Sequence, residues 1–486
     1  MNFNFKEILG DLILRQNIDT GDYFGVFCDS RRVKENSVFV AVRGTVSDGH
    51  NYINQALSSG AKAVIAEELP ENIPGVEVKD SSMACALLYR HFYGCPDKEL
   101  ALFGVTGTNG KTTSAYLIEH ILSYCGVPCG LLSTIECRLG KNREKSNSTT
   151  PGSESLYSSF RKVNDAGLKA CAFELSSHAL HQNRAGGIRL RGAVLTNITR
   201  DHLDYHGTVE NYFQAKKRAF TRLLDPDNGV AVINVDDPGG ERMARELAGI
   251  CRLLTFGTTP AADWQITDFE SSIENASFVL KNYQKELKIT TSLFGRHNIE
   301  NLAGVILLCL DFGLPEEKVL EAVSDSIHIP GRLERYVDSD GVFYFIDYAH
   351  TPDALERVLS TLRNDVRGRL FSVFGAGGNR DRGKRPEMGR AAAKHADVII
   401  ITNDNPRDEN PQDIINEIIS GIPENKEYIV IPDRKEAIRY AASHSKNSDV
   451  VLISGKGHED YQEIAGVRYD FSDAAELGKI LEELNK

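Results

Sequence analysis

The sequence predicts a three-domain α/β protein: a small N-terminal α/β domain, a central domain with a mainly parallel sheet, and a C-terminal doubly wound domain. Three observations lead to this fold class. Short apolar runs of strand length alternate with helical patterns, which is typical of sheets covered by helices on both faces. A glycine-rich segment, 104–113, connects one such run to a helical pattern. The length of 486 residues exceeds what one core usually sustains.

The N-terminal domain is predicted to span residues 1–97 and to end at the turn-forming run Gly94-Cys95-Pro96-Asp97. We expect strands at 38–42 and 63–66 and helices at 52–59 and 83–93. Ser30 lies in the polar segment Asp29-Ser30-Arg31-Arg32, directly after an apolar stretch. This segment is either a strand end that contacts a ligand or a solvated turn, and the residues by themselves leave both possibilities open.

The central domain is predicted to span residues 98–329. Its expected strands are 100–105, 170–175, 192–198, 229–235 and 253–256, followed by an antiparallel excursion over 264–294 where apolar and polar residues alternate. In parallel sheets of this type, ligands gather at the carboxyl ends of the strands. Glu174 lies at the end of one of these strands and His202 follows the next, so we expect both to face the glycine-rich loop.

That loop, Gly104-Val105-Thr106-Gly107-Thr108-Asn109-Gly110-Lys111-Thr112-Thr113, has the composition of a phosphate-binding loop. Its glycines let backbone N–H groups converge on an anion, and the following helix adds the positive end of its dipole. A glycine-rich turn without chemical function is the alternative, but a Lys-Thr pair at a helix start favours a P-loop ATPase domain. The residues expected to bind ATP here are Gly107, Thr108, Asn109, Gly110, Lys111, Thr112 and Thr113, with Thr112 placed to hold Mg²⁺.

The C-terminal domain is predicted to span residues 330–486 and to be Rossmann-like. Its expected strands are 343–346, 369–374, 398–402, 428–431 and 450–453. Polar runs follow four of these strands, and we expect them to form a site along one edge of the sheet. These runs are 347–350, 375–382, 403–407 and 454–459.

Composition narrows the function further. A net charge of -12 and a pI near 5.6 argue against nucleic acid as the main partner. The nine cysteines lack a C-x-x-C pair, as in a reducing compartment, and a metal site at Cys125 and Cys129, which lie four residues apart, is disfavoured. No apolar run approaches a membrane span, and the first residues lack the pattern of a secretion signal. We therefore expect a cytoplasmic protein without membrane insertion. Separately, we expect a monomer.

Five motifs, in order along essentially the whole chain, resemble the Mur ligases, the ATP-dependent ligases of peptidoglycan synthesis, and among them those that add 2,6-diaminopimelate. The motifs are Thr106 to Thr113, Glu174 to His178, Asp201 to Gly207, Asp347 to Asp353, and Asp404 to Arg407. The resemblance implies that ATP phosphorylates the D-glutamyl carboxylate of UDP-MurNAc-L-Ala-D-Glu. The amine of meso-diaminopimelate would then attack the acyl phosphate and expel phosphate.

The resemblance also implies which residues form the reaction centre. Lys111, Glu174, His202 and Lys216 match catalytic positions, and Thr112, Glu174, His202 and Lys216 match the Mg²⁺ site. Lys216 matches a lysine that the family carries as a carbamate, a change from cation to anion; the neighbouring Lys217 is the alternative. For ATP beyond the phosphate loop, the matching residues are Asn298, beside His297, and Arg332, with Asp347 and His350 as secondary candidates.

The two other substrates are assigned by the same resemblance. For the nucleotide-sugar, the matching residues are Ser30, Thr149, Thr150, Ser176, Gln182 and Arg184. For the amino acid, they are Arg380, Asp404, Asn405, Pro406, Arg407, Gly455 and Glu459. Arg407 would discriminate diaminopimelate from lysine, because a planar guanidinium binds the extra carboxylate bidentately, and Glu459 suits the distal ammonium.

Three other functions are alternatives to a diaminopimelate-adding ligase. A lysine-adding ligase is disfavoured by Arg407, and a folylpolyglutamate synthetase by the segment Asp201 to Gly207. An ATP-dependent binding switch without ligase chemistry would not need Glu174, His202 and Lys216. Small departures from the family pattern, at Leu175, Asn379 and Asp408-Glu409-Asn410, remove no charged group that the mechanism needs.

Overall fold

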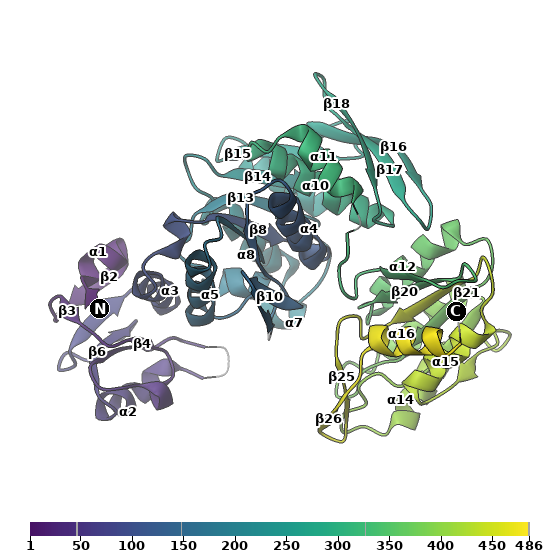
Figure 1. Cartoon of the computed structure of the whole chain (residues 1–486). Helices are drawn as coiled ribbons and strands as arrows, with labels where there is room; N and C mark the ends of the chain where they lie inside the picture. Colours follow the sequence, from purple (N-terminus) through teal and green to yellow (C-terminus); the bar gives the residue numbers. More distant parts are fainter. Residues whose placement is uncertain (45–46, 147, 326, 485–486) are drawn as a thin grey trace. The chain divides into compact units, whose positions relative to one another are not determined.

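The computed structural model describes residues 1–44, 47–146, 148–325 and 327–484 (Figure 1). The chain divides into two compact units, which we describe separately. The first holds Met1–Thr267, Val279–Leu287 and Glu300–Ala322, and the second holds Asp268–Phe278, Lys288–Ile299 and Val323–Lys486. Both units are built from sheets and helices, so the α/β class is confirmed.

The first unit begins with a five-stranded sheet in the order β2-β7-β6-β5-β4. Its strands are β2 (Ile13–Gln16), β4 (Val26–Phe27), β5 (Ser37–Val40), β6 (Ala61–Ala66) and β7 (Gly75–Val78). Strands β4 to β7 run parallel, and β2 pairs with β7 in the antiparallel sense. Its helices include α1 (Phe5–Leu9), α2 (Ile53–Ser58) and α3 (Ser81–Phe92).

An eleven-stranded sheet follows. Its strands are β8 (Ala101–Thr106), β9 (Cys129–Leu132), β10 (Glu136–Leu139), β11 (Asn142–Lys145), β12 (Ala170–Glu174), β13 (Leu190–Leu195), β14 (Val230–Asn234), β15 (Arg252–Gly257), β16 (Trp264–Ser271), β17 (Ala276–Lys281) and β18 (Glu286–Thr291). Their order is β11-β10-β9-β12-β8-β13-β14-β15-β16-β17-β18, and β9, β12, β8, β13, β14, β15 and β16 run parallel. The antiparallel excursion expected from residue 264 therefore begins with a parallel pairing of β16 and β15. Strand β8 therefore lies between β12 and β13. Because the three strands are parallel, the segments that follow them all leave the sheet at its carboxyl end.

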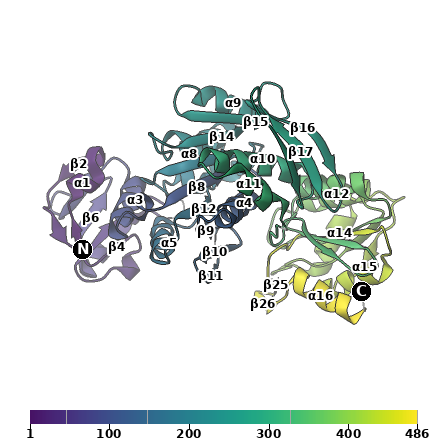
Figure 2. The same cartoon turned by 45° about the horizontal axis from the view of Figure 1, so that its top comes forward.

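Helices cover both faces of the parallel part of this sheet (Figure 2). They include α4 (Lys111–Tyr124), α5 (Ser153–Asp165), α6 (Ser177–His181), α7 (Leu203–His206), α8 (Val209–Thr221), α9 (Pro238–Leu247), α10 (Arg296–Asp311) and α11 (Glu316–Ser324). Side chains of α5, α8 and α9 share one buried core with Phe173 and Ala193 of the sheet. The neighbouring Gly192 lies instead under α10, where an added Cβ would come within 2.3 Å of Leu308. Successive residues of a strand thus point to opposite covered faces.

The second unit contains a six-stranded sheet in the order β19-β20-β24-β21-β22-β23. Its strands are β19 (Glu334–Val337), β20 (Phe343–Asp347), β21 (Leu370–Phe374), β22 (Val398–Ile401), β23 (Ile429–Val430) and β24 (Val450–Ser454). All are parallel except β19. One face is covered by α12 (Pro352–Asp365), α13 (Lys384–His395) and α14 (Pro411–Ile419), and the other by α15 (Arg434–His444) and α16 (Asp473–Glu483). This is the predicted doubly wound arrangement.

Some elements differ from the expectation. The predicted parallel strands of both sheets are present, with ends shifted by up to three residues. The sequence did not predict strands β2, β4, β7, β9, β10, β11 and β19, nor the hairpin of β25 (Tyr461–Ile464) and β26 (Val467–Asp470). All four residues of β11 are exposed and polar, so that segment lacks the apolar run that marks a buried strand. In the described part of the chain, no helix is long and apolar enough to span a membrane.

Candidate active site

The predicted phosphate loop connects β8 to α4 at the middle of the large sheet. Gly107 has φ 152° and Gly110 has φ 84°, both in the region that favours glycine. An added Cβ would lie 1.9 Å from Thr196 Oγ1 at Gly107 and 2.4 Å from Asn301 Oδ1 at Gly110. Side chains are therefore excluded at both positions by backbone conformation and by close neighbours.

The loop is fastened to the segment that follows β13. The backbone N–H groups of Thr108 and Asn109 donate to the backbone and side-chain oxygens of Asn197, at 2.9 and 3.0 Å. The N–H of Thr199 donates to Thr108 Oγ1 at 3.0 Å. Lys111 Nζ donates to the carbonyl oxygens of Gly107 and Thr108 at 3.0 and 2.8 Å. These bonds hold the lysine against the loop where phosphate oxygens would bind.

Lys216 reaches the same loop from α8. Its Nζ donates to the carbonyl of Gly107 at 2.7 Å, and the side chain is buried, with Nζ 4.5 Å from the ring centre of Tyr212. Burial and the charge of Lys111 hold the pKa of Lys216 well below its usual range. The sequence-neighbour Lys217 points elsewhere, to Glu246 at 2.8 Å. Of the two lysines weighed from the sequence, Lys216 is the one at the phosphate loop.

Glu174 ends β12, next to β8, and only 1% of it is exposed. Its Oε1 accepts from the N–H of Thr134 at 2.6 Å. The hydroxyl of Thr150 donates to the backbone oxygen of Glu174 at 2.8 Å and accepts from the N–H of Ser176 at 2.9 Å. Thr150 thus ties the segment before α5 to the end of β12.

Four histidines lie together beyond this strand end, on α6 and α7 and just before α7. The rings of His178 and His202 are 4.8 Å apart, and His178 also contacts Tyr205 and His206. His202 adopts a left-handed conformation with φ 51°. Burial lowers the pKa of His178, His181 and His202, and lowers the pKa of His206 to about 4. These imidazoles are therefore neutral at pH 7.

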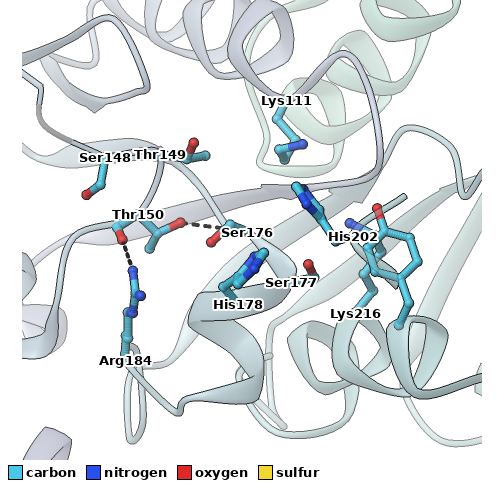
Figure 3. A pocket seen from close by; sticks show the side chains of 11 residues that line it. Lys111, Ser148, Thr149, Thr150, Ser176, Ser177, His178, Arg184, His202 and Lys216 are labelled. Atoms are coloured by element: carbon cyan, nitrogen blue, oxygen red, sulfur yellow. Dashed lines mark hydrogen bonds between the residues drawn. The ribbon is translucent and has the colours of Figure 1, made fainter. Parts of the chain in front are cut away.

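A pocket of about 240 Å³ is lined by some of these groups, whereas Glu174, His181 and His206 are not part of its lining (Figure 3). Its lining residues are Lys111, Ser148, Thr149, Thr150, Ser176, Ser177, His178, Arg184, His202, Tyr212 and Lys216. Figure 3 shows Lys111, His202 and Lys216 on one side, and Thr149, Thr150 and Arg184 on the other. Arg184 donates to the carbonyl of Thr150 at 2.7 Å and to Gln182 Oε1 at 2.9 Å. Within the described ranges its guanidinium forms no ion pair with a carboxylate.

Ser30 lies in the small N-terminal sheet region, outside the lining of this pocket. It is buried and donates to Gln55 Oε1 at 2.9 Å. Arg32, two residues on, forms a bidentate ion pair with Glu154 of α5 at 2.6 and 2.7 Å. This pair connects the Ser30 segment to the helix that follows Thr149 and Thr150.

Thr112, Glu174, His202 and Lys216 are the side chains expected to hold Mg²⁺. The ion prefers hard oxygen ligands, and among the described residues Glu174 Oε2 has no protein partner. Thr112 supplies a hydroxyl in the first turn of α4, and His202 a neutral imidazole. Lys216 carries only N–H donors and fits the set solely as a carbamate. No group of three or more histidine, cysteine, aspartate or glutamate side chains in the described chain is arranged to hold a metal, so this set depends on Thr112 and on the lysine.

In the second unit, residues predicted to bind the amino-acid substrate lie together at the carboxyl ends of β22 and β24. Asn405 Nδ2 donates to Glu459 Oε2 at 2.9 Å. Arg407, with φ 52° and a side chain 19% exposed, donates through Nη1 to the carbonyl of Gly378 at 2.6 Å. Asp404 Oδ2 is buried without a protein partner in the described chain, and an added Cβ on Gly455 would lie 2.7 Å from it. Arg380 is exposed on the neighbouring loop.

Lys456 and Glu463 are parts of this group that the sequence did not single out. Lys456 is fully buried, and its Nζ donates to Asn405 Oδ1 at 3.0 Å and to Glu459 Oε2 at 3.2 Å. Glu463, on β25, places Oε2 3.6 Å from Arg407 Nε. Lys456 could have been found as a lysine between two glycines after a strand, whereas nothing in the sequence brings the hairpin of Glu463 to Arg407.

The remaining predicted ATP residues, Asn298 and Arg332, belong to the second unit, and their nucleotide contacts stay a prediction. Asn298 donates to the carbonyl of Phe294 at 2.8 Å, and the guanidinium of Arg332 lies 4.9 Å from the ring centre of Tyr348. Asp347 is buried and accepts from the N–H groups of Leu333 and Ala349, both at 2.8 Å. Asp347 therefore organises the backbone around residue 333.

In the first unit, sequence reasoning overlooked Ser148, Ser177 and Tyr212 as pocket residues. Tyr212 lies four residues before Lys216 on α8, and that spacing places both on one face of a helix. Its hydroxyl is 3.0 Å from Thr108 Oγ1. Helical spacing from Lys216 is the signal that could have found it.

Comparisons with known proteins agree with this geometry. Three family models match: the Mur ligase middle domain over residues 105–309, the Mur ligase glutamate ligase domain over 331–457, and the Mur ligase family catalytic domain over 22–93. A protein of Aquifex aeolicus (strain VF5), named UDP-N-acetylmuramoyl-L-alanyl-D-glutamate–2,6-diaminopimelate ligase, is 42% identical over 458 residues, covering 94% of this chain and 93% of the relative. A protein of the same name from Geobacter metallireducens is 38% identical, covering 95% and 94%.

Solved structures give the same picture. A structure of a protein with that name aligns over 100% of both chains with a TM-score of 0.75 and 33% identity. The MurF ligase from Thermotoga maritima in complex with ADP aligns over 94% of this chain and 97% of that one, with a TM-score of 0.61. At 20% identity, the second likeness concerns the fold alone.

Proposed function

The chain belongs to the Mur ligase family, and we propose that it joins 2,6-diaminopimelate to UDP-N-acetylmuramoyl-L-alanyl-D-glutamate at the expense of ATP. It is an ATP-dependent ligase that forms an amide between an acid and an amino acid, in the synthesis of peptidoglycan precursors. One observation carries the proposal: a single pocket is lined by the phosphate-loop residue Lys111 and by Arg184, a cation without a carboxylate partner in the described chain.

This pairing matches the first chemical step. A carboxylate must approach the γ-phosphate of ATP, and the two anions repel unless cations lie beside both. Lys111 and the start of α4 would bind the phosphates, and Arg184 would bind the carboxylate of the D-glutamyl residue. Transfer of the γ-phosphoryl group gives an acyl phosphate and ADP. The amine of diaminopimelate then attacks the carbonyl carbon and phosphate leaves.

We propose that Thr112, Glu174, His202 and carbamylated Lys216 hold Mg²⁺, which when bound would neutralise charge on the phosphoryl oxygens. Carbamylation requires a neutral amine, because only the unprotonated nitrogen attacks carbon dioxide. Burial and Lys111 favour that form of Lys216 by lowering its pKa. The carbamate would then carry a negative charge near Lys111, whose positive charge also acts on Lys216.

The nucleotide-sugar is proposed to contact Ser30, Thr149, Thr150, Ser176 and Gln182 in addition to Arg184. Hydroxyl and amide groups suit a sugar and a peptide. For the amino acid, Arg407 would bind the distal carboxylate of meso-diaminopimelate, and Asp404 and Glu459 would bind ammonium. The buried Asp404 Oδ2 without a protein partner supports an ammonium at this place.

The proposal also includes the domain boundaries, the rest of the ATP site and the oligomeric state. We propose three domains: residues 1–97 for the nucleotide-sugar, 98–329 for ATP and 330–486 for the amino acid. We also propose that Asn298 and Arg332 contribute to the ATP site and that the protein acts as a monomer in the cytoplasm, without nucleic acid or membrane partners.

Phosphate release tests the function. The purified protein, incubated with UDP-MurNAc-L-Ala-D-Glu, ATP and Mg²⁺, is expected to release phosphate with meso-diaminopimelate and far less with L-lysine. Mass spectrometry should detect the tripeptide product. A preference for L-lysine would overturn the proposed substrate, and phosphate release without any amide product would overturn the ligase assignment.

A further inference from the structure

Cys28 and Cys85 bring two thiols into direct contact in the N-terminal sheet region. Cys28 follows β4 and is exposed, whereas Cys85 lies on α3 and is only 7% exposed. Their sulfur atoms are 2.8 Å apart, although the residues are 57 positions apart in sequence. All nine cysteines are free thiols.

The two thiols have different environments. The hydrogen bond with Cys28 and burial hold the pKa of Cys85 well above its usual range, so Cys85 is protonated at pH 7. Cys28 is open to solvent and accessible to a dissolved reagent. An accessible thiol beside a second, sheltered thiol is the arrangement of an attacking and a resolving cysteine.

We propose that Cys28 and Cys85 are a thiol-modification site and form a reversible disulfide with low-molecular-weight disulfides as oxidant. The Cys28 thiolate attacks one sulfur of the oxidant and releases its first thiol, leaving a mixed disulfide on Cys28. Cys85 then gives its proton to solvent and attacks Cys28 Sγ, releasing the second thiol. The protein loses two protons and two electrons, and the oxidant takes up both to become two thiols.

The fold can accommodate this bond. A disulfide requires the sulfur atoms to approach to roughly 2.0 Å, and the present separation of 2.8 Å leaves only a small movement. Cys28 lies after the edge strand β4, so its side chain can move without breaking the pairing inside the sheet. In a reducing compartment such a bond is transient and responds to the thiol pool, as redox-sensing disulfides do.

The bond would also act on the neighbouring segment. Ser30 is two residues after Cys28, and Arg32 forms the bidentate pair with Glu154. Tyr89, one turn after Cys85 on α3, donates to the same Glu154 at 3.5 Å. The segment of Ser30 is already linked to α5 through Arg32 and Glu154, and a disulfide would link it to α3 as well. It would restrict the adjustment of Ser30 to the nucleotide-sugar, an effect that rests on the proposed function, whereas formation of the disulfide does not.

The chemical test uses the full-length protein and oxidised glutathione at pH 8. After native incubation, free thiols are alkylated, and proteolytic peptides are mapped by mass spectrometry. We expect a peptide pair linked through Cys28 and Cys85 in the wild-type protein, lost again on treatment with dithiothreitol. Cys251→Ser, which removes a partly buried cysteine of the central region, should give the same linked pair. In Cys28→Ser, Cys85 should stay a free thiol.

Two results would overturn the modification site. One is a stable glutathione adduct on Cys28 while Cys85 remains free, and the other is the same loss of thiols in Cys28→Ser as in the wild type. The functional effect is read separately, as a several-fold rise in the KM for the nucleotide-sugar after oxidation, reversed by dithiothreitol and absent from Cys28→Ser. An unchanged KM in fully cross-linked protein would overturn the effect on Ser30. Failure of the proposed ligase function would show instead as inactivity of the reduced protein while the cross-link still forms.

Discussion

Replacing Arg407 by methionine should weaken diaminopimelate binding without altering the other substrates. The guanidinium donates through Nη1 to the carbonyl of Gly378 at 2.6 Å, which fixes its orientation. Among the described residues Nη2 has no protein partner, and the nearest carboxylate oxygen, on Glu463, is 3.6 Å from Nε. The Nη2 side of the Arg407 guanidinium is therefore available to a ligand carboxylate.

The magnitude follows from this geometry. Each hydrogen bond between charged groups contributes about 1.5–3 kcal/mol. Loss of a bidentate pair at a side chain only 19% exposed should therefore cost about 3–4 kcal/mol, equivalent to about 10²–10³-fold in KM for meso-diaminopimelate. Arg407→Lys retains the charge but not the fork, so its effect should fall between the wild type and methionine.

The assay measures phosphate release against meso-diaminopimelate at saturating ATP and nucleotide-sugar. Arg468→Met is the matched control, because Arg468 Nε lies 3.9 Å from the same Glu463 oxygen but its side chain is 66% exposed. We expect the control to resemble the wild type and all variants to keep the same KM for ATP. Equal effects of the Arg407 and Arg468 changes, or a change of less than about threefold in Arg407→Met, would refute the reasoning.

Other changes test the remaining parts of the site. Lys216→Ala should abolish turnover and regain part of it with added small carboxylates such as formate or acetate, while Lys217→Ala stays active; an active Lys216→Ala protein would contradict the carbamate. Gly107→Ala should lower the free energy of unfolding of its domain by about 1–3 kcal/mol and weaken ATP binding, because its Cβ overlaps a neighbouring hydroxyl. Gly126→Ala, with φ 85° and nothing within 4 Å of an added Cβ, isolates the cost of backbone strain, and an equal effect on ATP binding would argue against the overlap. For His206, burial lowers the pKa from 6.5 to about 4, so the unfolded chain binds more protons and stability falls as the pH drops between these values, by up to about 3 kcal/mol. His206→Gln should flatten the dependence of the denaturation midpoint on pH in this window, and an unchanged slope would assign it to other groups.

Much of the fold followed from local patterns. Buried parallel strands are largely apolar along their length. Strand β12, which ends at Glu174, and strand β8, which precedes the loop of Lys111, could be recognised for that reason. Strand β11 could not, because its residues 142–145 are all exposed and it is held only by pairing with β10. The hairpin of β25 and β26 is likewise mostly polar, so its formation depends on cross-strand bonds rather than on a buried face.

The sequence by itself determined the chemistry that the chain can perform. A lysine after glycines at a helix start indicates ATP, and a guanidinium in the right motif indicates a substrate carboxylate, because these properties belong to single residues and their neighbours in the chain. Only the tertiary structure decided which groups meet. It placed Lys216, rather than Lys217, on the carbonyl of Gly107, buried Lys456 between Asn405 and Glu459, and brought Cys28 against Cys85. Such contacts join residues far apart in sequence, and they arise from strand order and helix packing, which no local pattern encodes.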